Sequence, residues 1–180
     1  MKNWSTVACI ASGPSLTHDD CMLVASSGLP TIAVNNSCQL LPSCDVVFAS
    51  DLSWWNEYGE LVPHCARWTT CKIAAQRYHL QLLKSRFLEQ SYNSGQLAIE
   101  LAISLGAQRI LLLGYDCSIR IGTHWHGNHE NIRNPTLESV QRWRDEFLRL
   151  RQWAAGIEII NCSRRTELKV FPRGALEVEL

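Results

Sequence analysis

The stretch QLAIELAISLGAQRILLLGYD, residues 96–116, decides the fold class. Its first half carries Gln96, Glu100 and Ser104 four residues apart, a single polar stripe on an otherwise apolar segment, which predicts a helix. A glycine follows at the position of a C-terminal cap. The run RILLL, residues 109–113, is then apolar throughout, which is typical of a parallel strand covered on both faces. The stretch therefore predicts a helix, a tight turn and a central parallel strand.

Short apolar runs and helical segments alternate on both sides of this unit. Further strands are expected at residues 7–11, 31–34, 45–49, 67–70 and 157–161. Strands that alternate with helices favour an α/β fold, so we predict a Rossmann-like, doubly wound, mostly parallel sheet. The 180 residues suit one hydrophobic core, so we predict a single domain over residues 1–180, with the tail 164–180 left unassigned.

Four further helices are expected from caps and from apolar periodicity. Thr17 and Asp20 form an acidic variant of the capping box, and the helix that they open should end near Gly28. A short helix should carry Trp54, Trp55 and Tyr58, and an amphipathic helix is expected over 78–89. The last helix should start at Asn134-Pro135 and end at Gly156. Its core-facing stripe is expected to consist of Val140, Trp143, Phe147, Leu150 and Ala154.

Composition narrows the classes of protein. The formal net charge is zero, which disfavours a nucleic-acid binder. No export signal and no apolar run of membrane-spanning length is visible, so we expect a cytoplasmic protein without a membrane span. The eight cysteines contain no Cys-x-x-Cys pair and are expected to be free thiols in a reducing compartment. Seven tryptophans leave room for an aromatic interface in a homo-oligomer.

Small and polar residues gather where the predicted strands end. In doubly wound sheets the ligand lies beyond the carboxyl ends of the strands. A helix start adds free N–H groups and a dipole that favour an anion. The convergence predicts a small-molecule nucleotide ligand, held by Ser12, Gly13, Pro14, Ser15, Asn35, Ser50, Asp51 and Gly114 from the strand ends and by Asn93, Ser94 and Gly95 from the helix start.

The carboxylates at these strand ends have two interpretations. Asp51 and Asp116 can hold Mg²⁺ near phosphates or accept a hydrogen bond from a ribose hydroxyl. They can also be loop or helix-capping carboxylates.

The first strand is followed by Ser-Gly-Pro-Ser, which is neither a Gly-x-Gly-x-x-Gly fingerprint nor a Walker loop, so a classical dinucleotide site and a P-loop ATPase are disfavoured.

The stretch THWHGNHEN, residues 123–131, places three histidines within six positions. It can be a zinc site, a lid with a catalytic or phosphate-contacting histidine, or a polar loop. No cysteine and no Glu-x-x-His helix completes a zinc set, so we favour the lid and predict no metal ligands. Histidine suits proton transfer because its pKa lies near neutrality. We assign catalytic roles to His126, His129 and Asp116, and place His124 beside the nucleotide.

These motifs together resemble two families. SGPSL after the first strand, Asn35, VVFASD, the helix opened by NSG, LLLGYD and HWHGNH are similar to the bacterial lipooligosaccharide sialyltransferases that use CMP-sialic acid. SGPSL, the helix start, GYD and GTHWHG also resemble the archaeal 6-hydroxymethyl-dihydropterin pyrophosphokinases. The sequence is similar, too, to small phage and prophage proteins.

The resemblance implies a nucleotide site and a transferase. Carried over by position, the nucleotide site would consist of Ser12, Gly13, Asn35, Ser50, Asn93, Ser94, Gly114 and Asp116. The general-base histidine of the sialyltransferases aligns with Asn128, one residue before His129. The expected activity is glycosyl or pyrophosphoryl transfer from a nucleotide or nucleotide-sugar donor, with Mg²⁺ in the pyrophosphoryl case. The alternatives are a non-catalytic phage-type protein that sequesters a nucleotide, and an interaction protein whose site has decayed.

Overall fold

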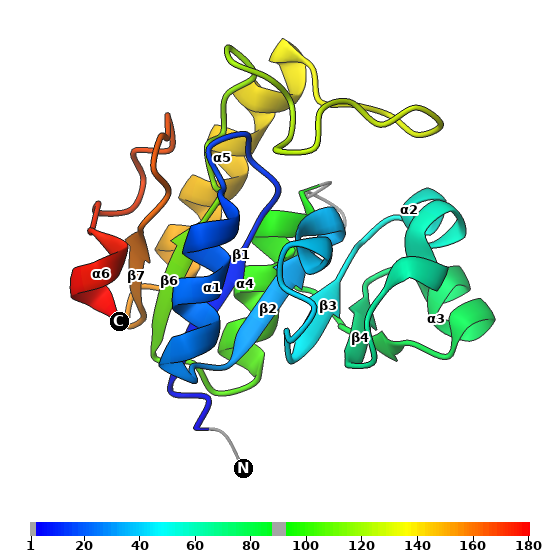
Figure 1. The fold of residues 1–180 in the computed structure, drawn as a ribbon, viewed down its shortest axis with the longest axis horizontal. Helices are drawn as coiled ribbons and strands as arrows, with labels where there is room; N and C mark the ends of the chain where they lie inside the picture. The colour runs from blue at the N-terminus through cyan, green and yellow to red at the C-terminus, as the bar shows by residue number, and fades with distance from the viewer. Residues whose placement is uncertain (1–2, 88–92) are drawn as a thin grey trace.

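A single parallel sheet forms the centre of the protein. The computed structural model describes residues 3–87 and 93–180, and within them seven strands pair in the order β5-β4-β3-β2-β1-β6-β7 (Figure 1). All neighbouring strands run parallel, which confirms the predicted α/β, Rossmann-like, doubly wound fold. The strands are β1 (Thr6–Ile10), β2 (Thr31–Val34), β3 (Val46–Phe48), β4 (Ala66–Thr69), β5 (Gln81–Leu82), β6 (Arg109–Leu113) and β7 (Glu158–Asn161).

The strand order contains one reversal. From β1 the chain moves outward through β2, β3, β4 and β5, and then returns to place β6 on the other side of β1. In doubly wound sheets the loops that follow the two strands beside such a reversal run in opposite directions, and a crevice for a ligand opens between them. The topology therefore directs attention to the carboxyl ends of β1 and β6.

Helices cover both faces of the sheet. The side chains of α4 (Ser94–Ser104) and α5 (Leu137–Trp153) belong to one core cluster, and those of α1 (His18–Ser27), α2 (Leu52–Tyr58) and α3 (Lys72–Tyr78) belong to the other. The short elements are the 3-10 turns η1 (Asn35–Gln39) and η2 (Gly59–Leu61) and the C-terminal α6 (Leu176–Glu179). No helix in the described residues is long and apolar enough to cross a membrane.

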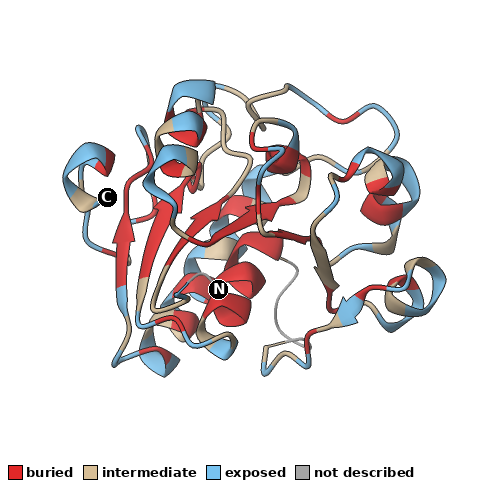
Figure 2. Cartoon of the chain, turned by 60° about the horizontal axis from the view of Figure 1, so that its bottom comes forward, coloured by how far each residue is buried: buried red, intermediate tan, exposed pale blue. Residues whose placement is uncertain are grey.

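Alternate residues of each strand face the two helical layers. In β1, Val7 and Cys9 pack with α4 and α5, whereas Ala8 and Ile10 pack with α1. Figure 2 shows the buried strands between outer helical surfaces that are exposed. A strand with apolar side chains toward both layers explains the unbroken apolar runs of the sequence.

The helix α4 is buried more completely than its polar stripe suggests. Gln96 and Glu100 are both buried, and only Ser104 of the stripe is exposed. Glu100 accepts hydrogen bonds from the Ser85 hydroxyl and, at 2.7 Å, from the Arg86 backbone N–H. Glu100 thus binds a neighbouring loop, which is how a buried carboxylate is normally satisfied.

Two helix predictions were wrong. The expected helix over 78–89 is absent from its described part: α3 ends at Tyr78, His79 adopts a left-handed conformation, and Gln81–Leu82 pairs with β4 as β5. Residues 88 and 89 lie outside the described residues. The other error is the start of α5, which is capped by Thr136 through a capping box with Ser139, two residues after the expected Asn134 cap.

The tail left unassigned by the sequence packs against the sheet. Leu168, Phe171 and Leu176 are buried, and Asn161 bridges to Arg173 in parallel fashion. Arg109 pairs with Glu158 of β7 and with Glu179 of α6. These contacts hold the last residues beside β6 and β7 (Figure 1).

Candidate functional site

A cavity of about 870 Å³ lies at the carboxyl edge of the sheet, and we call it the carboxyl-edge cavity. It is bounded by the loops after β1, β2 and β6, by the start of α4 and by the segment 123–135. The predicted site residues that line it are Ser12, Gly13, Pro14, Asn35, Asp51, Asn93, Ser94, Gly95, Gly114, Asp116, His124 and His129. Ser15, Ser50 and His126 do not line it, but each contacts a residue that does.

The loops after β1 and β6 touch through two glycines. The Gly13 N–H donates to the Gly114 carbonyl at 2.9 Å. A Cβ on Gly13 would lie 2.3 Å from Oδ1 of Asp116, and a Cβ on Gly114 would lie 2.2 Å from the Ala11 carbonyl oxygen. Gly114 also has a φ of +68°, a conformation that glycine adopts without strain. Both glycines are therefore needed for the close approach of the two loops.

Asp116 joins the same two loops. Its Oδ2 accepts from the Ser15 N–H at 2.8 Å, and its Oδ1 accepts from the Ser15 hydroxyl at 2.7 Å. Burial raises the pKa of the Asp116 carboxyl, although the hydrogen bonds from Ser15 oppose the rise. Because both oxygens are engaged by the chain, the geometry gives Asp116 a positioning role at the cavity wall.

The start of α4 is held by its own capping residue, Asn93, and by Ser50 from the loop after β3. The Asn93 carboxamide oxygen accepts from the N–H groups of Gly95 at 2.9 Å and of Gln96 at 3.2 Å. The hydroxyls of Ser94 and Ser50 lie 2.7 Å apart, and the Ser50 N–H donates to Ser94 Oγ at 3.1 Å. The loop after β3 is thereby tied to the helix whose positive end faces the cavity.

Asn35, directly after β2, is the most unusual residue of the cavity wall. Its φ of +53° is uncommon outside glycine, and its side-chain oxygen is buried without a hydrogen-bond partner among the described residues. Cys117, another lining residue, also has a positive φ, of +48°. Strained backbone and unpaired polar atoms concentrate at functional sites, where a ligand can satisfy them.

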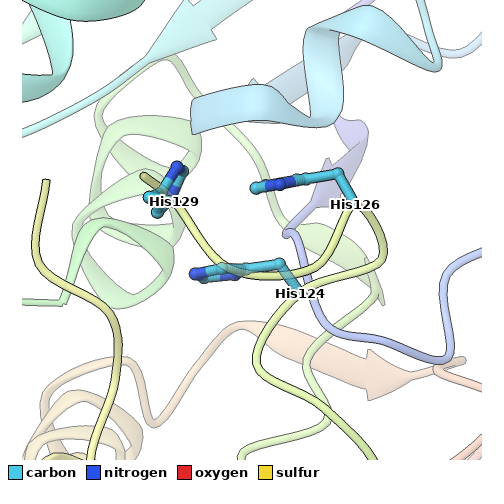
Figure 3. A group of neighbouring side chains, drawn as sticks. All are labelled: His124, His126 and His129. Carbon is cyan, nitrogen blue, oxygen red and sulfur yellow. The ribbon is translucent and has the colours of Figure 1, made fainter. Parts of the chain in front are cut away.

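His124, His126 and His129 lie close together as a cluster (Figure 3), and His124 and His129 line the cavity. Their ring centroids are separated by 5.0 Å for 124–126, 4.8 Å for 124–129 and 4.9 Å for 126–129. One ring nitrogen from each lies within 4.8 Å of the others. The Nε2 atoms of His124 and His126 are buried without a hydrogen-bond partner among the described residues. We call this group the histidine cluster.

Contacts within and outside the loop hold the histidine cluster. The Trp125 N–H donates to the Ser12 carbonyl at 3.0 Å, so the loop is attached to the end of β1. Gly127, at a φ of +85°, donates to the His124 carbonyl at 3.1 Å and reverses the chain. Asn134 accepts from the His129 N–H at 2.7 Å and donates to its carbonyl at 2.9 Å. The Tyr58 hydroxyl lies 2.8 Å from Nδ1 of His129.

Burial favours the neutral form of all three imidazoles. Burial lowers the pKa values of His124 and His126 to about 4, with His129 adding to both shifts, and burial also lowers the pKa of His129. Neutral rings offer lone pairs to a proton or a metal ion, and they carry no positive charge to offset a phosphate. This argues against a role as a cationic clamp.

Several lining residues were missed by sequence reasoning. They are Tyr115, Asn131, Ile132, Arg133, Arg142 and Trp143. Tyr58 and Asn134, which hydrogen-bond to His129, were missed as well. Thr166 donates to the Tyr115 carbonyl at 2.7 Å, so the tail also supports the loop after β6. No spacing rule links these residues to the strand ends, because α2, α5 and the tail reach the site only through the fold.

Comparison with known proteins finds similarity in structure. The MAf glycosyltransferase from Magnetospirillum magneticum AMB-1 superposes with a TM-score of 0.66 over 98% of this chain, at 12% sequence identity. The chain spans 34% of the length of that protein. At this identity the similarity establishes a shared fold. No family model matches the sequence, and no curated protein matches it.

Proposed function

We propose that this chain is a transferase that binds a nucleotide or nucleotide-sugar donor in the carboxyl-edge cavity, with the histidine cluster at the acceptor end. The observation that carries the proposal is the meeting of the ends of β1, β2 and β6 with the start of α4 in one cavity. Its volume of about 870 Å³ falls in the range of small-molecule and cofactor sites. The glycosyltransferase fold of the structural neighbour is in keeping with this proposal.

The lining matches the chemistry of such a donor. The helix α4 directs its positive end toward the cavity, and Arg133 and Arg142 also line it, so a diphosphate would meet favourable charge. Asn35 offers an unpaired carboxamide oxygen that can accept from a base amino group or a ribose hydroxyl. The proposed donor thus has its phosphates near Ser94 and its nucleoside near Asn35.

Glycosyl transfer is the class that the geometry supports better. Pyrophosphoryl transfer relies on Mg²⁺ held by carboxylates. Of the two carboxylates in the lining, Asp116 is engaged by Ser15 through both oxygens, which leaves Asp51. In glycosyl transfer the acceptor oxygen bonds to the anomeric carbon, the bond to the donor phosphate breaks, and the nucleotide leaves with the electron pair. The acceptor proton must go to a base, and the histidine cluster supplies neutral imidazoles there.

The first prediction concerns Asn35. The variant Asn35→Gly removes the carboxamide and keeps the positive φ without strain, so folding should be unaffected. We expect the variant to bind nucleoside diphosphates at least about tenfold more weakly, because the hydrogen bond between the nucleoside and the buried Asn35 carboxamide is lost. Calorimetry with CDP, UDP, GDP and ADP measures the change. Asn3→Ala, at the opposite edge of the sheet, is the matched control and should bind as the wild type does. Equal affinity in Asn35→Gly and wild type would contradict the proposed donor position.

Turnover separates the proposal from its alternatives. Release of free nucleotide from CMP-, UDP- and GDP-linked sugars, lost in His129→Ala while binding persists, supports the transferase. Tight nucleotide binding without turnover of any of these donors favours a sequestering protein. Conversion of a nucleoside triphosphate to its monophosphate that requires Mg²⁺ and is lost in Asp51→Asn favours pyrophosphoryl transfer. If the protein binds no nucleotide, the proposal is wrong.

A further inference from the structure

The histidine cluster has the features of a metal site as well as those of a proton acceptor. We propose that His124, His126 and His129 together bind one Zn²⁺ ion at the edge of the carboxyl-edge cavity. This inference rests on the geometry of the three rings and does not depend on the proposed donor. It also reverses our interpretation of the sequence, in which the missing cysteine or Glu-x-x-His helix argued against zinc.

The three rings are nearly equidistant from one another. The three centroid separations differ by only 0.2 Å, between 4.8 and 5.0 Å, so the rings surround a common point (Figure 3). In the described part of the chain this is the single group of three histidine, cysteine or acidic residues close enough to share an ion. Catalytic zinc sites commonly have three protein ligands and one open position.

Binding requires a modest adjustment of the side chains. The nitrogens are within 4.8 Å of one another, whereas tetrahedral ligands at zinc distances lie about 3.4 Å apart. The rings of His124 and His126 stack with an interplanar angle of 11°, and their lone pairs must turn toward one point. Both changes are rotations about side-chain bonds, because the backbone is already held by Ser12 and Asn134.

Two ring nitrogens of the histidine cluster are unsatisfied within the described part of the chain. The buried Nε2 atoms of His124 and His126 have no hydrogen-bond partner among the described residues. A buried polar group without a partner destabilises a fold, and native structures retain few of them. One metal ion would satisfy both atoms at once. An unpaired pair of imidazole nitrogens that face a third ring is the chemistry expected of metal ligands.

A hydrogen bond at its other nitrogen orients the His129 ring. The Tyr58 hydroxyl lies 2.8 Å from Nδ1, which leaves Nε2 of that ring for the metal. Metal-binding histidines are usually oriented in this way by a hydrogen bond at the other nitrogen. Glu57, one residue before Tyr58, accepts a hydrogen bond from Asn131 at 2.7 Å and adds a negative charge near the cluster.

The donor set selects the metal. Three imidazoles suit Zn²⁺ and other late transition metals, whereas Mg²⁺ and Ca²⁺ prefer oxygen ligands. Because His124 and His129 line the cavity, the open fourth position would be reached from it. In the proposed transfer, an acceptor hydroxyl bound there would be more acidic and would give its proton to solvent in the cavity, because the imidazoles would then serve as ligands and not as the base.

The test is metal analysis of tag-free protein purified without added metal. We expect about one zinc per chain in wild type and in the control His64→Ala, whose exposed histidine lies outside the cluster. His126→Ala should hold less than about a tenth of an equivalent, with an unchanged circular dichroism spectrum. Asn35→Gly should keep its zinc, so the result is independent of nucleotide binding.

Titration of chelator-treated protein with ZnCl₂ distinguishes a protein that lost its zinc during purification from one that has no zinc site. Wild type should bind one equivalent, and Tyr58→Phe should bind it about 10- to 100-fold more weakly because the orienting hydrogen bond is lost. Stoichiometric zinc in His126→Ala would overturn the assignment. So would wild-type protein that is purified without zinc and then binds ZnCl₂ no better than His126→Ala. In both cases nucleotide binding, measured in chelator, would still be judged separately.

Discussion

At the scale of single residues, the carboxyl-edge cavity depends on two glycines, which have no side chain. Gly13 and Gly114 let the loops after β1 and β6 touch, and the distances of 2.3 and 2.2 Å to a hypothetical Cβ leave no room for alanine. The sequence alone makes these glycines candidates for close approach to a ligand. The structure adds a second reason for glycine at both positions, because a Cβ at either one would clash with the opposite loop.

Gly114→Ala should destabilise the protein strongly. The new methyl would meet the Ala11 carbonyl and force a left-handed alanine, so we expect a loss of at least about 3 kcal/mol in the free energy of unfolding. Gly28→Ala is the matched control: Gly28 has a φ of +74° with nothing within 4 Å of a Cβ, and should lose only about 1 kcal/mol. Urea denaturation measures both. Equal losses would show that the contact between the loops is unimportant.

Asp116 shows the limit of prediction for single residues. Its place after a buried strand made it a candidate site residue, and it does line the cavity. Its two hydrogen bonds to Ser15 were not predictable, because the two residues are separated by 101 positions and meet only through strand pairing. A strand end indicates which residues gather, but the partners of each side chain come from the packing.

At the scale of elements, α1 is fixed by its capping box and by a link to the tail. Thr17 and Asp20 cap each other, as predicted. Asp20 also accepts from Arg164 at 2.8 Å. Burial would raise the pKa of Asp20, but the hydrogen bonds from Arg164 and Thr17 outweigh it and hold the pKa below its usual value.

Asp20→Asn should therefore destabilise the protein in a pH-dependent way. A carboxyl with a lowered folded-state pKa stabilises the fold above its unfolded pKa, and this contribution is lost as the pH falls through the folded value. At neutral pH we expect the variant to lose about 1 kcal/mol, a modest value because the Arg164 side chain is 52% exposed. Thermal unfolding from pH 7 to pH 3 should show the difference between variant and wild type shrink below about pH 4. A difference that is constant with pH would contradict this role of the charge.

The elements best predicted from the sequence are those with a long, consistent pattern. The unit at residues 96–116 is found as expected, and Val140, Phe147 and Leu150 of the predicted α5 stripe are buried. Trp143 of that stripe is only half-buried and lines the cavity. The region from α3 to β5 was misread because its elements are short. There, pairing of Gln81–Leu82 with β4 outweighs the local helical pattern.

At the scale of the whole molecule, the topology brings together what the sequence kept apart. Parallel strands end at one edge, so the gathering of Ser12, Asn35, Ser94 and Asp116 could be predicted without a structure. The histidine cluster could not, because its geometry depends on the Gly127 turn and on Tyr58, 71 positions away from His129. The account therefore depends on a nucleotide that occupies the carboxyl-edge cavity.

The most direct test is amide chemical-shift mapping of ¹⁵N-labelled protein during titration with CDP, UDP, GDP and ADP. We predict that at least one nucleotide shifts the amides of Gly13, Asn35, Ser94 and Gly95, which line the cavity. The amides around Arg164 and Arg173, which line a separate pocket of about 150 Å³, should remain unchanged. Shifts confined to that second pocket, or no shifts with any of the four nucleotides, would contradict the account.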